Sequence, residues 1–82
     1  MKEVFIYDAV RTPRGKGRKD GSLHEVTALA LSTTVLNNII ERNDLGGHLV
    51  EDVIWGNVTQ IGEQGGCLAR TAVLASELDE SV

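Results

Sequence analysis

A single cysteine and two histidines are the side chains of this sequence best suited to nucleophilic or metal chemistry. Cys67 follows two glycines where a helix is predicted to begin, and a helix N-terminus lowers the pKa of a thiol and favours the nucleophilic thiolate. We favour the alternative of a small buried residue near the helix cap, because free cysteines commonly pack as small hydrophobes. His24 and His48 have no partner at ligand spacing, whereas a zinc site needs a cluster of ligands. We therefore expect solvated histidines and no metal site.

Four cations crowd a glycine-containing loop at residues 14–19, namely Arg14, Lys16, Arg18 and Lys19. The whole chain carries a net charge of −4, so the loop is a basic patch on an acidic protein. Its charges and glycine amides could bind phosphate, although it lacks the spacing of a P-loop or a dinucleotide-binding turn. Such a patch indicates an anionic small molecule more than nucleic acid. We favour a flexible, solvated loop, because charged loops are common.

Three further charged residues are candidates for structural ties. Asp8 and Arg11 come at the end of a predicted strand, a position that is often functional in open α/β sheets. We favour a structural ion pair or a hydrogen-bonding tie to a neighbouring loop for both. Arg70 lies inside a predicted helix and is expected to be a structural anchor rather than a catalytic residue. The sequence offers no set of a nucleophile, a base and a group that orients the base. The residues alone therefore predict no particular reaction.

The hydrophobic pattern divides the chain into four elements. Residues 4–7 and 52–58 are apolar on both faces, which is typical of strands in a parallel sheet. A helix is predicted to begin at a capping box on Ser22 or at the competing cap Thr27, and to end at Arg42. A second helix is predicted over residues 68–78. The residues expected to face the core are Ala28, Leu29, Ser32, Val35, Leu36, Ile39 and Ile40 in the first helix, and Leu68, Ala72, Val73 and Ala75 in the second.

The predicted fold class is α/β, in the order β-α-β-α, with two parallel strands joined by a right-handed crossover. Two parallel strands do not make a stable sheet, and two helices cannot cover both of its faces. We therefore expect the start of a larger sheet that is incomplete as an isolated domain. The apolar runs are too short to cross a bilayer, and acidic residues interrupt the apolar run at the N-terminus. We therefore expect no signal peptide and a cytoplasmic location, with import into an organelle left open as an alternative.

Five patterns, in order along the chain, resemble the thiolase family of acetyl-CoA acetyltransferases and 3-ketoacyl-CoA thiolases. They are residues 4–13 with an Asp-x-x-Arg-Thr-Pro turn, Gly21-Ser22-Leu23 before a helix, residues 52–60 with a Gly-Asn-Val-x-Gln ending, Ala69-Arg70 followed by Ala72, and residues 80–82. The chain departs from many relatives in its longer, more basic loop and in Gly65-Gly66-Cys67, where they have Gln-Asn-Pro.

The resemblance implies that residues 1–82 are the amino-terminal portion of a thiolase N-terminal domain with a mixed sheet and covering helices. Thiolases transfer acyl groups between coenzyme A thioesters, by Claisen condensation or thiolytic cleavage, through a cysteine acyl-enzyme. The nucleophile is expected beyond Val82 and Cys67 aligns with no catalytic position, so this segment is expected to be structural and inactive alone. No substrate-binding residue is assigned.

The resemblance further implies a role in fatty acid metabolism and a homo-oligomer, either a dimer or a tetramer. It implies no cofactor beyond the coenzyme A thioester substrate, no metal, no nucleic acid and no membrane partner. Two alternatives remain. One is a non-enzymatic module that associates with itself to hide its sheet edges. The other is an anion- or nucleotide-binding domain that uses the basic loop of residues 14–19.

Overall fold

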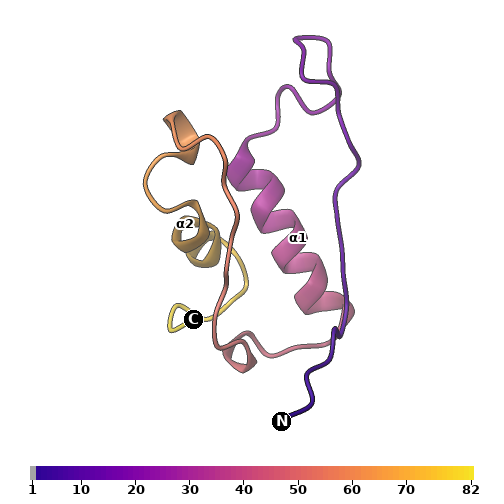
Figure 1. The fold of residues 1–82 in the computed structure, drawn as a ribbon, viewed down its shortest axis with the longest axis vertical. Helices are drawn as coiled ribbons and strands as arrows, with labels where there is room; N and C mark the ends of the chain where they lie inside the picture. Colours follow the sequence, from indigo (N-terminus) through magenta and orange to yellow (C-terminus); the bar gives the residue numbers. More distant parts are fainter. Residues whose placement is uncertain (1) are drawn as a thin grey trace.

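In the computed structural model, which describes residues 2–82, two helices are linked by long extended segments (Figure 1). Helix α1 spans Ala28–Arg42 and helix α2 spans Leu68–Ala75. Two short 3₁₀ turns, η1 at Gly47–Leu49 and η2 at Gly62–Gln64, lie between them. None of the described residues forms a helix long and apolar enough to cross a membrane.

Helix α1 begins at Thr27, the competing cap, and the capping box predicted at Ser22 is wrong. The Thr27 hydroxyl accepts a hydrogen bond from the amide of Ala30 at 3.0 Å, which satisfies one of the free amides of the first turn. Residues 21–26 instead form turns, because the amide of His24 bonds the carbonyl of Gly21 at 3.1 Å and a similar bond follows at Val26. The helix therefore starts about one and a half turns after Ser22, since a turn of α-helix takes about 3.6 residues.

The core lies where α2 packs against α1. Its buried members are Leu36, Ile40, Ala72, Val73 and Leu78, with Ala72 completely inaccessible to solvent. The predicted inner face of α1 is confirmed, since its buried residues belong to the expected set. Burying an aliphatic side chain of this size contributes roughly 1.5–3 kcal/mol, so this cluster is what holds the two helices together.

Helix α2 is shorter than predicted and ends at Ala75, which is exposed rather than facing the core. Ser76 ends it, because its hydroxyl donates to the carbonyl of Val73 at 2.8 Å and accepts from the amide of Leu78 at 3.2 Å. Serine competes in this way with helical hydrogen bonds. The turn it makes returns Leu78 to the core.

The predicted α/β fold is wrong for this structure, because residues 2–82 contain two α-helices and no strand. Residues 4–7 and 52–58 have no regular structure. Residues 9–13, which follow the first predicted strand, and residues 52–58 run alongside α1 (Figure 1). A cavity of about 260 Å³ at α1 is lined by Ala9 and Val10, which follow the first predicted strand, and by Trp55 of the second. Neither predicted strand is paired in a sheet, although Trp55 and residues 9 and 10 lie at the helix.

The segment of residues 52–58 is covered on one face only, whereas both faces were expected to be buried. Val53, Trp55 and Asn57 are partly covered, while Ile54 and Val58 are almost fully exposed. This alternation is what extended backbone produces when a single layer of helices lies beneath it. Residues 4–7 are exposed throughout, so their predicted burial is also wrong.

Candidate functional site

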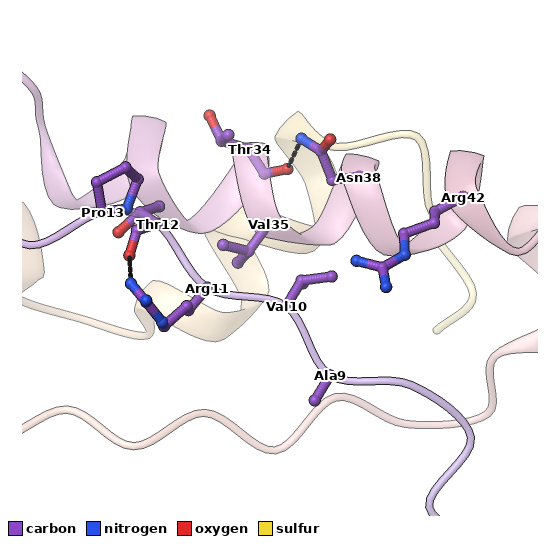
Figure 2. A pocket seen from close by; sticks show the side chains of 9 residues that line it. All are labelled: Ala9, Val10, Arg11, Thr12, Pro13, Thr34, Val35, Asn38 and Arg42. Atoms are coloured by element: carbon purple, nitrogen blue, oxygen red, sulfur yellow. Dashed lines mark hydrogen bonds between the residues drawn. The ribbon is translucent and has the colours of Figure 1, made fainter.

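A groove lies between residues 9–13 and the exposed side of α1, and Arg11 and Arg42 are among its lining residues (Figure 2). Its volume is about 350 Å³, and the remaining lining residues are Ala9, Val10, Thr12, Pro13, Thr34, Val35 and Asn38. The guanidinium of Arg11 donates to the carbonyl of Thr12 at 3.1 Å rather than to Asp8. The lining holds no thiol, imidazole or carboxylate. The groove therefore offers hydrogen-bond donors and the hydroxyls of two threonines, but no histidine or carboxylate that could act as a base.

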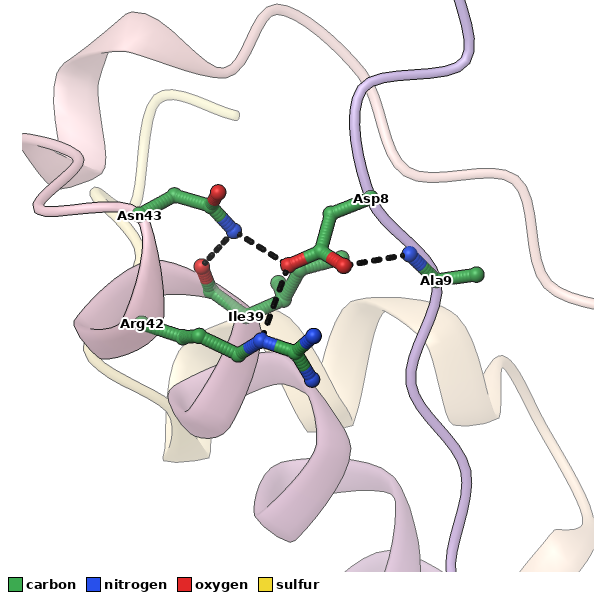
Figure 3. Close-up of polar contacts among 5 residues, drawn as sticks. All are labelled: Asp8, Ala9, Ile39, Arg42 and Asn43. Carbon is green, nitrogen blue, oxygen red and sulfur yellow. Dashed lines mark hydrogen bonds and ion pairs between the residues drawn. The ribbon is translucent and has the colours of Figure 1, made fainter.

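Asp8 is held by the end of α1, as Figure 3 shows. Its carboxylate accepts from the side-chain amide of Asn43 and from the amide of Ala9, both at 2.8 Å, and lies 3.3 Å from Nε of Arg42. Asn43 also donates to the carbonyl of Ile39 at 2.9 Å, which fixes the orientation of the amide. The Asn43 hydrogen bond is the main cause that lowers the pKa of Asp8 below its ordinary value of 3.8, with help from Ala9 and Arg42.

Arg70 spans the turn after α2. Its guanidinium donates to the carbonyl of Val82 at 2.9 Å and to that of Glu80 at 2.8 Å. The planar guanidinium suits two such bonds at once. The structural role expected of Asp8, Arg11 and Arg70 stays a prediction, although Asp8 and Arg70 each join segments that lie at least ten residues apart.

Cys67 is exposed, so its predicted role as a buried packing residue is wrong. It stands at the N-cap of α2, where its backbone is extended and its side chain makes no cap hydrogen bond. A cavity of about 160 Å³ beside it is lined by Trp55, Asn57 and Gln60 and by residues 66–69. This lining contains no histidine or carboxylate, whereas a second cavity that Cys67 lines, of about 170 Å³, also has Asp52 and Arg70 in its lining.

The two histidines lie apart from Cys67 in sequence and belong to other segments. Nε2 of His24 is 3.9 Å from a carboxylate oxygen of Glu25, and His48 is exposed within η1. In the part of the chain that the structure describes, no group of three or more His, Cys, Asp or Glu side chains could hold a metal ion.

The basic loop, defined from here on as residues 14–24, forms a series of turns beyond the N-terminus of α1 (Figure 1). Lys16, Arg18 and Lys19 line an open cavity of about 430 Å³ with Gly17, Leu23 and His24. Arg14 is not part of this lining. The structure thus divides the four cations of the predicted phosphate loop into three that share one cavity and one that stands outside it.

Sequence reasoning missed Asn43 and Arg42 as partners of Asp8, and Ser32 as the partner of Trp55. The indole nitrogen of Trp55 donates to the Ser32 hydroxyl at 3.2 Å. Ser32 carried a usable signal, because it is a polar residue on the predicted apolar face of α1 and is 5% exposed. Asn43 carried no signal of its contact with Asp8, since an asparagine after a helix ordinarily indicates only that the helix ends there.

Comparison with known proteins gives a match over nearly the whole chain. The model of the family described as "Thiolase, N-terminal domain" matches residues 4–82. Relatives described as 3-ketoacyl-CoA thiolases include those of Colwellia psychrerythraea, at 45% identity, and Pseudoalteromonas atlantica, at 43%. The relative from Cronobacter sakazakii is 40% identical. Each alignment covers 100% of this chain and 21% of the relative, so the chain spans about a fifth of their length. No solved structure matches the chain.

Proposed function

Because this chain belongs to the thiolase family, as its motifs predicted, we propose that it is part of an enzyme that transfers acyl groups between coenzyme A thioesters. The observation that carries the proposal is the alignment of the entire chain with 3-ketoacyl-CoA thiolases at 40–45% identity. A 3-ketoacyl-CoA is accordingly the substrate class. Thiolytic cleavage and the reverse condensation both pass through an acyl group held on a cysteine thiol.

In this proposal residues 1–82 support the fold, and the nucleophilic cysteine lies outside them. Two features of the structure support this division. The groove beside Arg11 contains no thiol, imidazole or carboxylate, and neither of the two cavities that Cys67 lines contains a histidine. The nucleophilic cysteine of an acyl-transfer enzyme is ordinarily activated by a paired histidine. We therefore expect the 82-residue chain to be inactive by itself.

A chimeric enzyme tests the proposal directly. The aligned segment of the Colwellia psychrerythraea thiolase is replaced by this chain, which shares 45% identity with it. Cleavage of a 3-ketoacyl-CoA by free coenzyme A is then followed, with the relative lacking its aligned segment as the inactive reference. The chimera should cleave the substrate, whereas the truncated relative and the isolated chain should not.

The chimera also separates the two interpretations of Cys67. Cys67→Ser in the chimera should leave the rate of cleavage within about twofold of the unsubstituted chimera, because the thiol is exposed and no histidine lies in the cavities that it lines. Loss of all activity in this variant would make Cys67 the nucleophile and contradict the proposed division of roles. A folded chimera without activity would contradict the proposed function itself.

A second candidate, self-association, has an observation of its own in its favour. Residues 4–7 present Val4, Phe5, Ile6 and Tyr7 to solvent, each at least 76% exposed. Exposed, extended apolar segments of this kind can pair with another chain. Sedimentation velocity of the chain and of Phe5→Lys would then show a concentration-dependent dimer or larger species that the substitution weakens. A monomer at all concentrations would exclude this candidate.

The remaining elements of the proposal follow from family membership. We propose a homo-oligomeric enzyme, a dimer or a tetramer, that works in the cytoplasm and in fatty acid metabolism. We propose no cofactor other than the coenzyme A thioester, which is its substrate, and no nucleic acid or membrane partner.

A further inference from the structure

We propose that the basic loop is a binding site for a small molecule that carries two or more phosphate groups. Lys16, Arg18 and Lys19 lie around one cavity of about 430 Å³, together with Gly17, Leu23 and His24. Ammonium and guanidinium groups form charge-assisted hydrogen bonds with phosphate oxygens, which are among the stronger polar contacts in proteins. Three cations around one open cavity match the clustered charge of such a ligand.

The three cations are not neutralised by the protein itself. Of the ion pairs found among residues 2–82, one joins Arg42 to Asp8 and the other places His24 beside Glu25. Neither involves Lys16, Arg18 or Lys19. Asp20 is the one acid within residues 14–24, and it is not among the residues that line the cavity. Mutual repulsion of the cations therefore remains in the free protein and is relieved when an anion binds.

The loop is held in shape by close backbone contacts, so the backbone that carries the cations is ordered before a ligand arrives. A Cβ atom on Gly21 would come within 2.1 Å of the carbonyl oxygen of Lys16, and one on Gly15 within 3.0 Å of the Leu23 side chain. The amide of Gly21 also donates to the carbonyl of Arg18 at 2.9 Å. A loop closed in this way loses less conformational entropy on binding than an open one.

The chemistry of the cavity favours a small phosphorylated molecule over nucleic acid. Its lining contains no Phe, Tyr or Trp, and His24 is its one aromatic side chain, whereas single-stranded nucleic acid is ordinarily bound by several aromatic side chains along the strand. The chain as a whole is acidic, with a net charge of −4, which would repel an extended polyanion. Two sources fit the shared chemistry of clustered phosphates. One is the phosphate-bearing end of coenzyme A, an identification that rests on the proposed function, and the other is a free nucleoside diphosphate.

Isothermal titration calorimetry of the 82-residue chain with four probes tests the proposal. Coenzyme A and ADP carry clustered phosphates, dephospho-coenzyme A lacks one phosphate, and pantetheine lacks all of them. Coenzyme A or ADP should bind, pantetheine should not, and binding should weaken as salt is raised. Coenzyme A binding at least tenfold more tightly than ADP and dephospho-coenzyme A identifies the thioester substrate as the source. Equal binding of coenzyme A and ADP identifies a free nucleotide.

Arg14 provides a matched control, because it belongs to the same loop but does not line the cavity. Lys16→Ala, Arg18→Ala and Lys19→Ala should each weaken binding of the phosphorylated probe by about three- to tenfold, as expected for loss of one charged contact. Arg14→Ala removes the same charge and should weaken it by less than about twofold. Equal losses in all four variants, or no binding of any phosphorylated probe, would overturn the proposal.

The same substitutions in the chimera keep this inference distinct from the proposed function. If the chimera is inactive but the chain binds ADP or coenzyme A, the proposed function fails and the phosphate site stands. If the chimera is active, Lys16→Ala with Arg18→Ala should raise the KM for coenzyme A by about tenfold, provided that coenzyme A is the ligand. An active chimera whose isolated chain binds no phosphorylated probe leaves the proposed function intact and refutes the phosphate site.

Discussion

The side-chain amide of Asn43 donates to the carboxylate of Asp8 at 2.8 Å and so connects residues that are 35 positions apart in the sequence. Asn43 is also the C-cap of α1. One residue therefore ends the helix and attaches the first extended segment to it. The described part of that segment has no backbone pairing with residues 52–58, so this contact and the ion pair to Arg42 are its main polar ties to the helix.

Asp8→Ala should release residues 4–13 from α1 while leaving the helix pair intact, because none of these residues belongs to the core cluster or is packed against it. Hydrogen exchange monitored by NMR should show faster exchange at Ala9 and its neighbours, with little change at Leu36 or Ala72. Asp52→Ala is the matched control. Asp52 accepts from the next amide at 2.9 Å, as Asp8 does, but it makes no long-range contact. Equal effects of the two substitutions would refute the tie.

The tie at Asp8 should depend on pH in the acid range. The pKa of Asp8 is lowered in the folded protein, mainly by Asn43, so the ionised form is favoured by folding. Its contribution is therefore complete well above the ordinary value of 3.8 and is lost as the pH falls below 3.8 through the lowered value. A carboxyl titration by NMR should place the midpoint below 3.8 and move it upward in Asn43→Ala. The same midpoint in Asn43→Ala as in the unsubstituted chain would contradict the role of Asn43 as the main cause of the lowered pKa.

Ser32 and Trp55 form a buried polar contact that should be sensitive to small changes. The Ser32 hydroxyl accepts from the Trp55 indole at 3.2 Å and donates to the carbonyl of Ala28 at 2.8 Å. Ser32→Ala should cost about 1 kcal/mol of unfolding free energy, because it leaves the indole donor without its partner. Trp55 is the single tryptophan, so its fluorescence reports the contact during urea unfolding. Thr34→Ala, which removes an exposed helix hydroxyl, should change neither the emission nor the midpoint appreciably.

The two helices could be predicted from the sequence, whereas the two predicted strands do not form. This difference has a physical reason. The apolar face of α1 is encoded in its own spacing, and the local hydroxyl of Thr27 sets its start. An extended apolar segment becomes a strand only when a partner backbone lies beside it, and residues 4–7 carry no information about where that partner is. The position of the basic loop was likewise predictable, whereas the separation of Arg14 from the other cations depends on how the turns fold.

Ala72 should tolerate no larger side chain. It is fully buried between the helices, whereas Ala75 lies on the same helix and is exposed. Ala72→Leu should therefore destabilise the chain by about 1–3 kcal/mol through overpacking, which is a large fraction of the stability of a small domain. Ala75→Leu should change the free energy of unfolding by less than about 0.5 kcal/mol. Urea midpoints followed by circular dichroism give both values, and similar midpoints would place the core elsewhere.

Gly21→Ala should distinguish a preformed phosphate site from a diffuse cloud of positive charge. The added Cβ would meet the carbonyl oxygen of Lys16 at 2.1 Å, so the turn must open, although no charge is changed. If the closed loop positions the cations, affinity for the phosphorylated probe should fall by about tenfold, since the entropy of ordering the loop is then paid on binding. Gly56→Ala places its Cβ in open space outside the cavity and is the matched control. Calorimetry at low salt compares the two variants. Unchanged affinity in both would mean that net charge alone attracts the ligand, while equal losses in both would mean that the loss does not come from opening this turn.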